Sequence, residues 1–277
     1  MGKLVVCPTP IGNLEDITER ALRELAEADL IACEDTRHTG VLLERYGIAG
    51  RLVSYHDHNE RARARELMRR MRAGDTVALV SDAGTPLIAD PGFELVRACL
   101  AAEVPVEVLP GPCAAVTALV ASALPMERFT FVGFLPRARG ELTRLLGEPG
   151  VGSLVAYESP RRLVATLTLA SERQRDRRAA VCRELTKIHE EVRRGTVHEL
   201  AEHYREHPPR GELVLVLAPA DPGSGAEHAA LSAVRELVES GARPRAAAAA
   251  VARLTGVAAN ELYRGLTTRG SDAAGRQ

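Results

Sequence analysis

The chain is poor in aromatic residues and in lysine. It has no tryptophan and only nine aromatic residues, four phenylalanines and five tyrosines, among 277. So few rings argue against a surface that binds nucleic acid mainly by stacking on bases. Lysine occurs only at Lys3 and Lys187, so arginine supplies almost all of the positive charge. A biased coding composition explains most of this preference, although the planar guanidinium also suits phosphate.

Cysteine content, net charge and apolar runs are also low. The five cysteines are scattered and never spaced as a CxxC pair, which argues against a disulfide framework and a zinc site. The formal net charge of −1 provides no overall field toward nucleic acid or membrane. No apolar run approaches bilayer length and no secretory signal is apparent, so we expect a cytoplasmic protein with no membrane segment and no metal site.

The chain does contain a regular alternation of apolar strand patterns with amphipathic helix patterns. Such alternation predicts an α/β fold with a mainly parallel sheet in an N-terminal domain over 1–124. The strand patterns of this domain lie at 4–7, 30–33, 52–54, 77–80 and 106–109. A second series predicts a mixed-sheet α/β domain over 125–222. Its strand patterns lie at 129–132, 153–157, 179–182 and 213–217.

The last part of the chain is rich in alanine. A Pro/Gly/Ser stretch at 219–225 predicts a linker, and 226–277 predicts a small helical domain of three short helices. Two of these helices, with Gly256 at the turn between them, resemble a helix-turn-helix motif. Because such patterns are common in alanine-rich sequence, a helical cap on the main body is favoured over a nucleic-acid-binding module.

Three strand patterns run directly into turns rich in glycine and proline, at 8–13, 82–86 and 110–115. In an open α/β sheet, ligands bind beyond the carboxyl ends of the strands, where backbone N–H and C=O groups are exposed. Gly84 has no Cβ and therefore lets a ligand approach the main chain closely. A single turn of this kind is common between secondary-structure elements and indicates no site by itself. Three together predict one pocket built mainly from backbone.

Eight segments carry recognisable motifs that cover almost the whole chain. They are Val6–Leu14, Glu34–Gly40, His56–Glu60, Val80–Pro86, Leu109–Ala115, Gly133–Pro136, Tyr157–Arg162 and Arg183–Lys187. In this order and spacing they resemble the tetrapyrrole methylase superfamily and, within it, the enzymes that methylate small-subunit ribosomal RNA. The resemblance implies two α/β domains with S-adenosylmethionine in the cleft between them, and a homodimer. It also implies 2′-O-methylation of a cytidine ribose in the decoding region of 16S rRNA.

The resemblance further assigns residues to the cofactor. The first turn contributes contacts to the cofactor. The second turn matches the loop that contacts the methionine part of the cofactor, and the third presents two small residues to its adenosyl part. In the second domain, a Tyr-Glu pair and one strand match the adenine-side contacts. The implied cofactor-binding residues are Pro8, Pro10, Asp82, Ala83, Gly84, Thr85, Cys113, Ala114, Tyr157, Glu158 and Leu215.

Two other interpretations are compatible with parts of the sequence. The first keeps the fold and makes a tetrapyrrole precursor the methyl acceptor. Ala83–Pro86 speaks against it, because relatives that methylate tetrapyrroles carry Gly-Asp-Pro there. The second is a regulator that binds a nucleotide-like ligand and contacts DNA through 226–277. The near-neutral net charge and the extent of the resemblance speak against this one.

A ribose hydroxyl is a poor nucleophile with a high pKa, so a base or strong acceptor near it would help. The candidates are Glu34, Asp35, His56, His58, Asp82, Glu158, Glu184 and Lys187. We expect Asp35, Arg37 and Glu158 to be catalytic, with Asp35 and Arg37 organising the acceptor ribose and phosphate. Asp35 directly follows a strand pattern and so shares the sheet edge of the predicted pocket. The two histidines fit a capping and turn cluster at least as well.

RNA contact requires positive charge gathered on one face. Six arginines crowd the helix pattern at 59–73, but such a run is often only a solvated helix face. The arginines beside the pocket motifs are therefore expected to be the better phosphate contacts. They are Arg37, Arg137, Arg139, Arg161 and Arg162. We expect recognition of rRNA by shape and phosphate rather than by wide base readout.

Overall fold

The computed structural model describes residues 2–147, 152–220 and 222–267, with side chains left out at 222–229 and 267. The chain forms two compact units. The first contains the residues up to Ala121 together with Cys182–Glu191, and the second contains Ser122–Val181 together with the residues from Val192 onward. The predicted boundaries at 124/125 and 222/226 remain predictions, but the segment 182–191 packs with the first unit although it lies within the predicted second domain.

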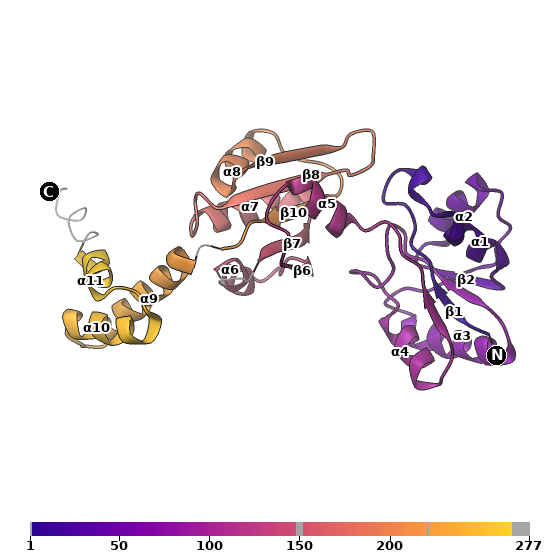
Figure 1. Cartoon of the computed structure of the whole chain (residues 1–277), viewed down its shortest axis with the longest axis horizontal. Coiled ribbons are helices and arrows are strands. Elements are labelled where there is room, and N and C mark those ends of the chain that lie inside the picture. The colour runs from indigo at the N-terminus through magenta and orange to yellow at the C-terminus, as the bar shows by residue number, and fades with distance from the viewer. Residues whose placement is uncertain (1, 148–151, 221, 268–277) are drawn as a thin grey trace. The chain divides into compact units, whose positions relative to one another are not determined.

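The first unit is built on a five-stranded sheet in the order β3-β2-β4-β1-β5 (Figure 1). All neighbouring strands in it are parallel, as the alternation of strands and helices predicts. In the register, Val5 lies between Ala78 and Glu107. The strands are β1 (Leu4–Val6), β2 (Leu30–Cys33), β3 (Leu52–Ser54), β4 (Val77–Leu79) and β5 (Val106–Val108).

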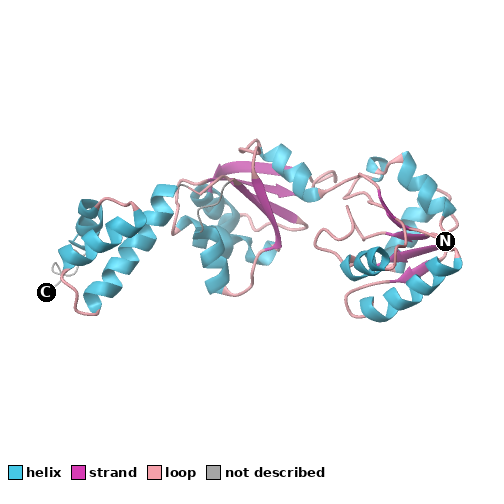
Figure 2. Cartoon of the chain, turned by 60° about the horizontal axis from the view of Figure 1, so that its bottom comes forward, coloured by secondary structure: helices cyan, strands magenta, loops and turns pink. Residues whose placement is uncertain are grey.

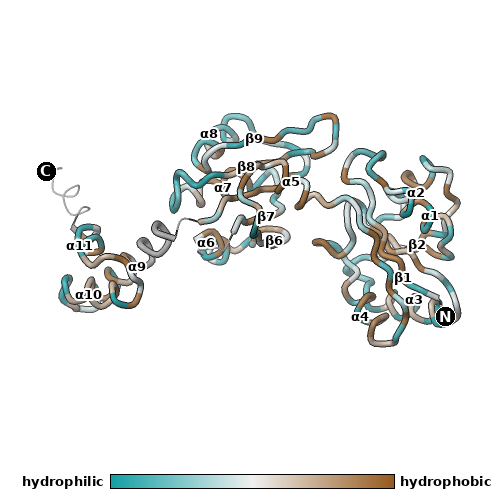
Figure 3. Tube along the Cα trace, viewed as in Figure 1, coloured by the Kyte–Doolittle hydropathy of each residue, from teal (hydrophilic) through white to brown (hydrophobic). Residues whose placement is uncertain are grey.

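Successive residues of a strand point to opposite faces of the sheet. Helices cover both faces of this one. Leu4 and Val6 belong to one apolar cluster with α3 (Glu60–Ala73) and α4 (Phe93–Ala101). Val5 belongs to the other, with α1 (Glu19–Glu27) and α2 (Thr36–Arg45). The central strands are accordingly apolar throughout (Figure 3), which explains why they read as continuous apolar runs.

Two further elements complete the first unit. A 3-10 helix, η1 (Leu14–Asp16), follows the first turn, and α5 (Ala114–Ser122) follows the third. The sequence analysis did not predict η1, because three residues carry no periodic signal. All five cysteines are free thiols, and four of them are buried in the fold.

The second unit contains a mixed sheet in the order β6-β7-β10-β8-β9 (Figure 2). Strand β7 pairs parallel with β6 and antiparallel with the central strand β10. Three helices share one apolar cluster with these strands. The strands are β6 (Phe129–Phe134), β7 (Ser153–Glu158), β8 (Arg178–Arg183), β9 (Glu191–Thr196) and β10 (Leu213–Leu217). The helices are α6 (Arg139–Gly147), α7 (Pro160–Ser171) and α8 (Val197–Glu206).

The edge strand β9 was not predicted from the sequence. Val192 is its only large apolar residue, and Arg193 and Arg194 are both exposed. A strand at the edge of a sheet buries little surface, so its sequence lacks the apolar signal by which central strands are detected.

The three predicted C-terminal helices are present as α9 (Pro222–Glu239), α10 (Pro244–Thr255) and α11 (Ala259–Thr267), and they share an apolar core. Gly256 ends α10 with a left-handed φ of 76°, which explains the glycine at this turn. The linker prediction is wrong for 222–225, because α9 begins at Pro222. Proline is well suited to the first position of a helix, where its missing N–H would have no partner.

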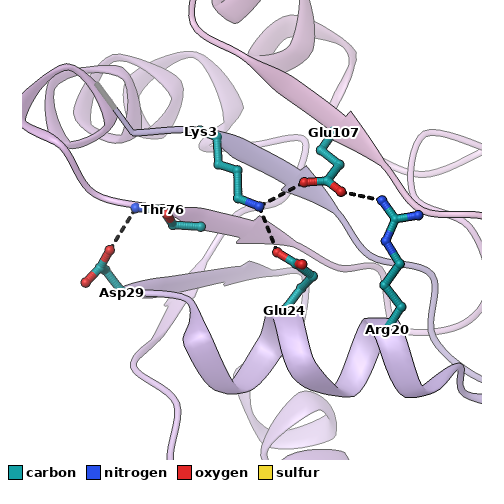
Figure 4. Close-up of polar contacts among 6 residues, drawn as sticks. All are labelled: Lys3, Arg20, Glu24, Asp29, Thr76 and Glu107. Atoms are coloured by element: carbon teal, nitrogen blue, oxygen red, sulfur yellow. Dashed lines mark hydrogen bonds and ion pairs between the residues drawn. The ribbon is translucent and has the colours of Figure 1, made fainter.

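A cluster of charges ties β1, β5 and α1 together across the first unit (Figure 4). Lys3 Nζ donates to Glu24 at 2.9 Å and to Glu107 at 2.8 Å, and Arg20 also pairs with Glu107. Close by, the Thr76 N–H donates to Asp29 Oδ2 at 2.8 Å. The Glu24 side chain is only 11% exposed, so its charge depends on Lys3.

Replacing Lys3 with methionine should lower the free energy of unfolding by about 1–2 kcal/mol, because Glu24 is left without its cation. The pKa of Lys3 is raised above 10.5, chiefly by the hydrogen bond to Glu107, and the pKa of Glu107 is lowered below 4.5, chiefly by Lys3. The lysine therefore adds stability until the pH rises through its raised pKa, and the carboxylate adds stability until the pH falls through its lowered one.

Chemical denaturation of the K3M variant and the parent between pH 3 and pH 9 measures this difference, with Lys3→Arg as the control that keeps the charge. The gap should be largest from about pH 5 upward and should shrink below about pH 4. A gap that does not change with pH would contradict an ionic role for Lys3.

Candidate functional site

The three glycine- and proline-rich turns meet at one place in the first unit. β4, β1 and β5 are parallel neighbours, so the turns that follow them leave the sheet at the same edge. Thr9 and Gly84 exchange two backbone hydrogen bonds, of 2.9 and 3.0 Å. Thr85 Oγ1 then donates to the Pro112 carbonyl at 2.8 Å, which joins the second turn to the third. The predicted convergence of the three turns is therefore confirmed.

Glycine is required in this arrangement at two positions. A Cβ on Gly111 would lie 2.5 Å from the Pro8 Cβ, so the third turn rests directly against the first. Gly84 has a φ of +84°, a conformation that side-chain-bearing residues rarely adopt, and a Cβ there would lie 3.2 Å from Ile11 Cγ2. The main chains of the turns approach one another closely, which leaves backbone groups as the principal lining of this edge.

The segment Cys182–Glu191 packs against the first turn. The Asn13 N–H donates to Thr186 Oγ1 at 2.9 Å, and a Cβ on Gly12 would lie 2.5 Å from Lys187 Cγ. Glu184 and Thr186 both have positive φ, of 49° and 66°. Strained backbone of this kind persists where the surroundings hold it in place and often marks a functional site. The Arg183–Lys187 motif therefore packs against the first turn and supports it.

Asp35 lies at the N-terminus of α2 and binds Arg37. Its Oδ1 accepts from the Arg37 backbone N–H at 2.8 Å and from Arg37 Nε at 3.1 Å, and its Oδ2 accepts from Arg37 Nη2 at 2.7 Å. These bonds hold the pKa of Asp35 well below its usual range, so its carboxylate is a weak base. The Asp35 N–H donates to Asp82 Oδ1 at 3.1 Å, which connects the end of β2 to the second turn.

A group of carboxylates gathers where β3, β2 and β4 end. The pKa of Asp90 is raised to about 6, chiefly by burial and also by the charges of Glu34, Asp82 and Asp57, against a hydrogen bond with Ser81 that lowers it. The pKa of Glu34 is raised as well, first by burial and then by Asp82 and Asp57. Sequence reasoning missed Asp90 because it followed the second turn only as far as Pro86. The Asp90-Pro91-Gly92 turn in the same loop was the available signal.

The His56–Glu60 motif mostly shapes its own loop. Asn59 Oδ1 accepts from the His56 N–H at 3.0 Å, and Asn59 Nδ2 donates to Ser54 O at 3.2 Å. Glu60 Oε1 accepts from the Tyr55 hydroxyl and from the Gly92 N–H, both at 3.0 Å, at the start of α4. These contacts agree with the capping and turn interpretation. Within the described residues, no three His, Cys, Asp or Glu side chains are grouped as metal ligands.

In the second unit, Glu158 is a buried residue with several partners. Its side chain is 0% exposed and accepts from the Ser159 N–H and from Thr166 Oγ1, both at 2.7 Å. Arg162 lies 3.4 Å from the same carboxylate and donates to two backbone carbonyls of the Gly133–Pro136 motif. Arg162 is therefore committed to this loop, and the expectation that it contacts RNA phosphate does not agree with these bonds.

The other predicted residues of the second unit lie on its sheet. Tyr157 makes edge-to-face contacts with Phe131 and Phe134, with ring centroids 5.1 and 5.5 Å apart. The Leu215 side chain is buried in the apolar core, and its strand β10 lies between β7 and β8 in the sheet. The roles assigned to Tyr157, Glu158 and Leu215 remain predictions.

Comparison with known proteins agrees with this architecture. The family model of the tetrapyrrole (corrin/porphyrin) methylases matches residues 3–201. A ribosomal RNA small subunit methyltransferase I from Hydrogenobaculum sp. (strain Y04AAS1) is 48% identical over 219 residues, covering 78% of this chain and 95% of the relative. The protein of that name from Escherichia coli O157:H7 is 44% identical over 274 residues, covering 95% of this chain and 94% of the relative.

Solved structures show the same fold. A uroporphyrin-III-C-methyltransferase from Thermus thermophilus, 27% identical, aligns with a TM-score of 0.58 over 78% of this chain and 94% of its own. Another structure of the Thermus thermophilus enzyme, in complex with S-adenyl homocysteine, is 23% identical and aligns with a TM-score of 0.55, covering 78% and 97%. The chain therefore belongs to the ribosomal RNA small subunit methyltransferase I family of the tetrapyrrole (corrin/porphyrin) methylases.

Proposed function

We propose that the chain transfers a methyl group from S-adenosylmethionine to the ribose 2′-hydroxyl of a cytidine in 16S rRNA. The match to the Escherichia coli relative over 95% of this chain carries this proposal. The family model, which matches residues 3–201, spans all three convergent turns. A homodimer and a cytoplasmic site of action, both implied by the family resemblance, are part of the proposal. No described helix is long and apolar enough to cross a bilayer.

The residues at the sheet edge fit the proposed cofactor. The absence of a Cβ at Gly84 and Gly111 lets the three turns pack together, which fixes the backbone groups of this edge in place. The carboxylates of Glu34, Asp82 and Asp90 give the edge a negative potential that suits a sulfonium and an ammonium group. When bound, S-adenosylmethionine supplies a methyl group that is already activated as a sulfonium. From the first unit, we assign to it Pro8, Pro10, Asp82, Ala83, Gly84, Thr85, Cys113 and Ala114.

This chain's residues would then supply alignment and a proton acceptor. Asp90 is suited to accept a proton, because burial and neighbouring charges raise its pKa to about 6. Asp35 is suited to a different task, since its two bonds to the Arg37 guanidinium fix an arginine whose side chain is 90% exposed. We assign to this pair the positioning of the acceptor ribose and its phosphate.

The purified chain should methylate 30S subunits with labelled S-adenosylmethionine, and the label should resist alkaline cleavage at a single cytidine, because a 2′-O-methyl group blocks that reaction. Uroporphyrinogen serves as the competing acceptor, and sedimentation of the same sample should give a dimer of the 29.8 kDa chain. Methyl incorporation into uroporphyrinogen, or none into 16S rRNA, would overturn the proposed function.

Gly111→Ala should weaken S-adenosylmethionine binding at least about 10-fold, because its Cβ would force the third turn away from Pro8. Isothermal titration calorimetry measures this effect directly. Gly140→Ala is the matched control, since a Cβ there meets nothing within 4 Å in a helix of the second unit. Equal affinities for both variants would show that the contact between the turns does not shape the cofactor site.

Single-turnover methylation should increase as the pH rises through about 6, as Asp90 loses its proton and becomes able to accept one. Asp90→Asn should remove this step and lower the rate by about 10²–10⁴-fold. Asp35→Asn should lower the rate without moving the step, because the pKa of Asp35 lies far below it. A step that persists in the Asp90→Asn variant would assign the titration to another group.

The same Asp90→Asn variant should remain folded. A raised carboxyl pKa favours the protonated form in the folded state, so ionised Asp90 destabilises the fold at neutral pH. Thermal denaturation should therefore show the variant to be at least as stable as the parent at pH 7.5, with the difference vanishing below about pH 4. This behaviour separates a lost base from a lost fold.

A further inference from the structure

The helix α3 carries an arginine row that the cofactor site does not use. Arg61, Arg65, Arg69 and Arg72 follow one another at intervals of four, four and three residues, which places them on one face of the helix. All four are exposed, and they line a groove of about 760 Å³ between α3 and α4. Ala64 and Met68, both buried, form part of its floor together with Ala98.

The two other arginines of α3 serve the fold. Arg63 Nε donates to Ser54 O at 3.1 Å, and its Nη1 donates to Glu66 at 2.6 Å. Arg70 pairs with Asp75 at 2.6 Å. Two arginines of α3 are therefore held by contacts within the fold, and the other four form a row that faces the groove.

The acidic residues of the groove are already neutralised by other partners. Glu66 forms an ion pair with Arg63, and Glu94 forms one with Arg97 at 2.7 Å. Among the residues that the structure describes, none of the four row arginines is paired with a carboxylate, and Arg65 alone donates to a helix carbonyl. Like charges at this spacing repel one another and destabilise a helix slightly. A polyanion that bound along the row would relieve that repulsion.

The row is physically connected to the proposed site of methyl transfer. Glu60, directly before Arg61, accepts a hydrogen bond from Gly92 in the loop that carries Asp82 and Asp90. The groove thus begins beside the sheet edge and follows α3 away from it. Four helical residues rise about 6 Å, a step comparable with that between successive phosphates of an RNA strand.

Resting on the proposed function, we propose that the α3–α4 groove binds the phosphate backbone of the rRNA that flanks the methylated nucleotide. Guanidinium groups bind phosphate through two parallel hydrogen bonds, and the small side chains of the floor allow a sugar-phosphate chain to approach. The contact is independent of base sequence, in keeping with the scarcity of aromatic side chains. It secures the substrate strand on the same unit that holds the carboxylates.

The test is a triple variant, R65Q/R69Q/R72Q, compared with R23Q/R45Q/R51Q. The control arginines are equally exposed, are unpaired among the described residues, and lie on α1, on α2 and before β3. Both variants change the net charge by the same amount. Binding to protein-free 16S rRNA and to 30S subunits is measured between 50 and 200 mM salt, with calorimetry of S-adenosylmethionine binding as the fold control.

The groove variant should bind protein-free 16S rRNA at least about 10-fold more weakly at 50 mM salt. The slope of log affinity against log salt should fall by about 2, since three phosphate contacts are lost. The control should match the parent, and cofactor affinity should be unchanged in both. Equal slopes for the two variants would overturn the proposal. Weakened binding to 30S subunits with unchanged binding to free rRNA would overturn it in favour of an acidic ribosomal protein. A parent that binds rRNA through the groove but transfers no methyl group would refute only the proposed function.

Discussion

The close approach of three backbone turns at one edge of a parallel sheet is the constraint on which the rest of this protein depends. Two hydrogen bonds between Thr9 and Gly84 hold the first two turns together, and the missing side chain of Gly111 lets the third rest on Pro8. These contacts hold the main chain of all three turns in place before any ligand binds. Such preorganisation is what a transfer reaction limited by alignment requires.

Charge is separated within the first unit, although the chain as a whole is almost neutral. Carboxylates gather at the ends of β3, β2 and β4, while guanidinium groups that have no carboxylate partner among the described residues line the groove between α3 and α4. A cationic cofactor and a polyanionic substrate can therefore be held by one small domain without an overall charge of either sign.

Several polar residues of the motifs make hydrogen bonds that support the fold. Glu60 fastens the start of α4, and Glu158 is buried among three partners that include Arg162. Thr186 fastens the first turn from a strained loop. Each of these residues is polar because a buried or irregular backbone must have its hydrogen bonds satisfied. The same motifs contain residues proposed for the reaction and residues that support the fold. Only their contacts in the structure distinguish the two kinds.

The sequence by itself determined the fold class, the central strands and the three turns, because apolar runs and glycine-proline punctuation are local consequences of burial and backbone geometry. It did not reveal β9, whose edge position leaves no apolar signal, or the α9 helix at Pro222–Gly225, where helix and linker residues look alike. Only the tertiary structure decided that Asp90 sits among other carboxylates and that 182–191 joins the first unit. It also decided which arginines of α3 pair with a carboxylate of the described residues and which do not. A pKa and an ion pair depend on neighbours distant in sequence, and those neighbours exist only once the chain has folded.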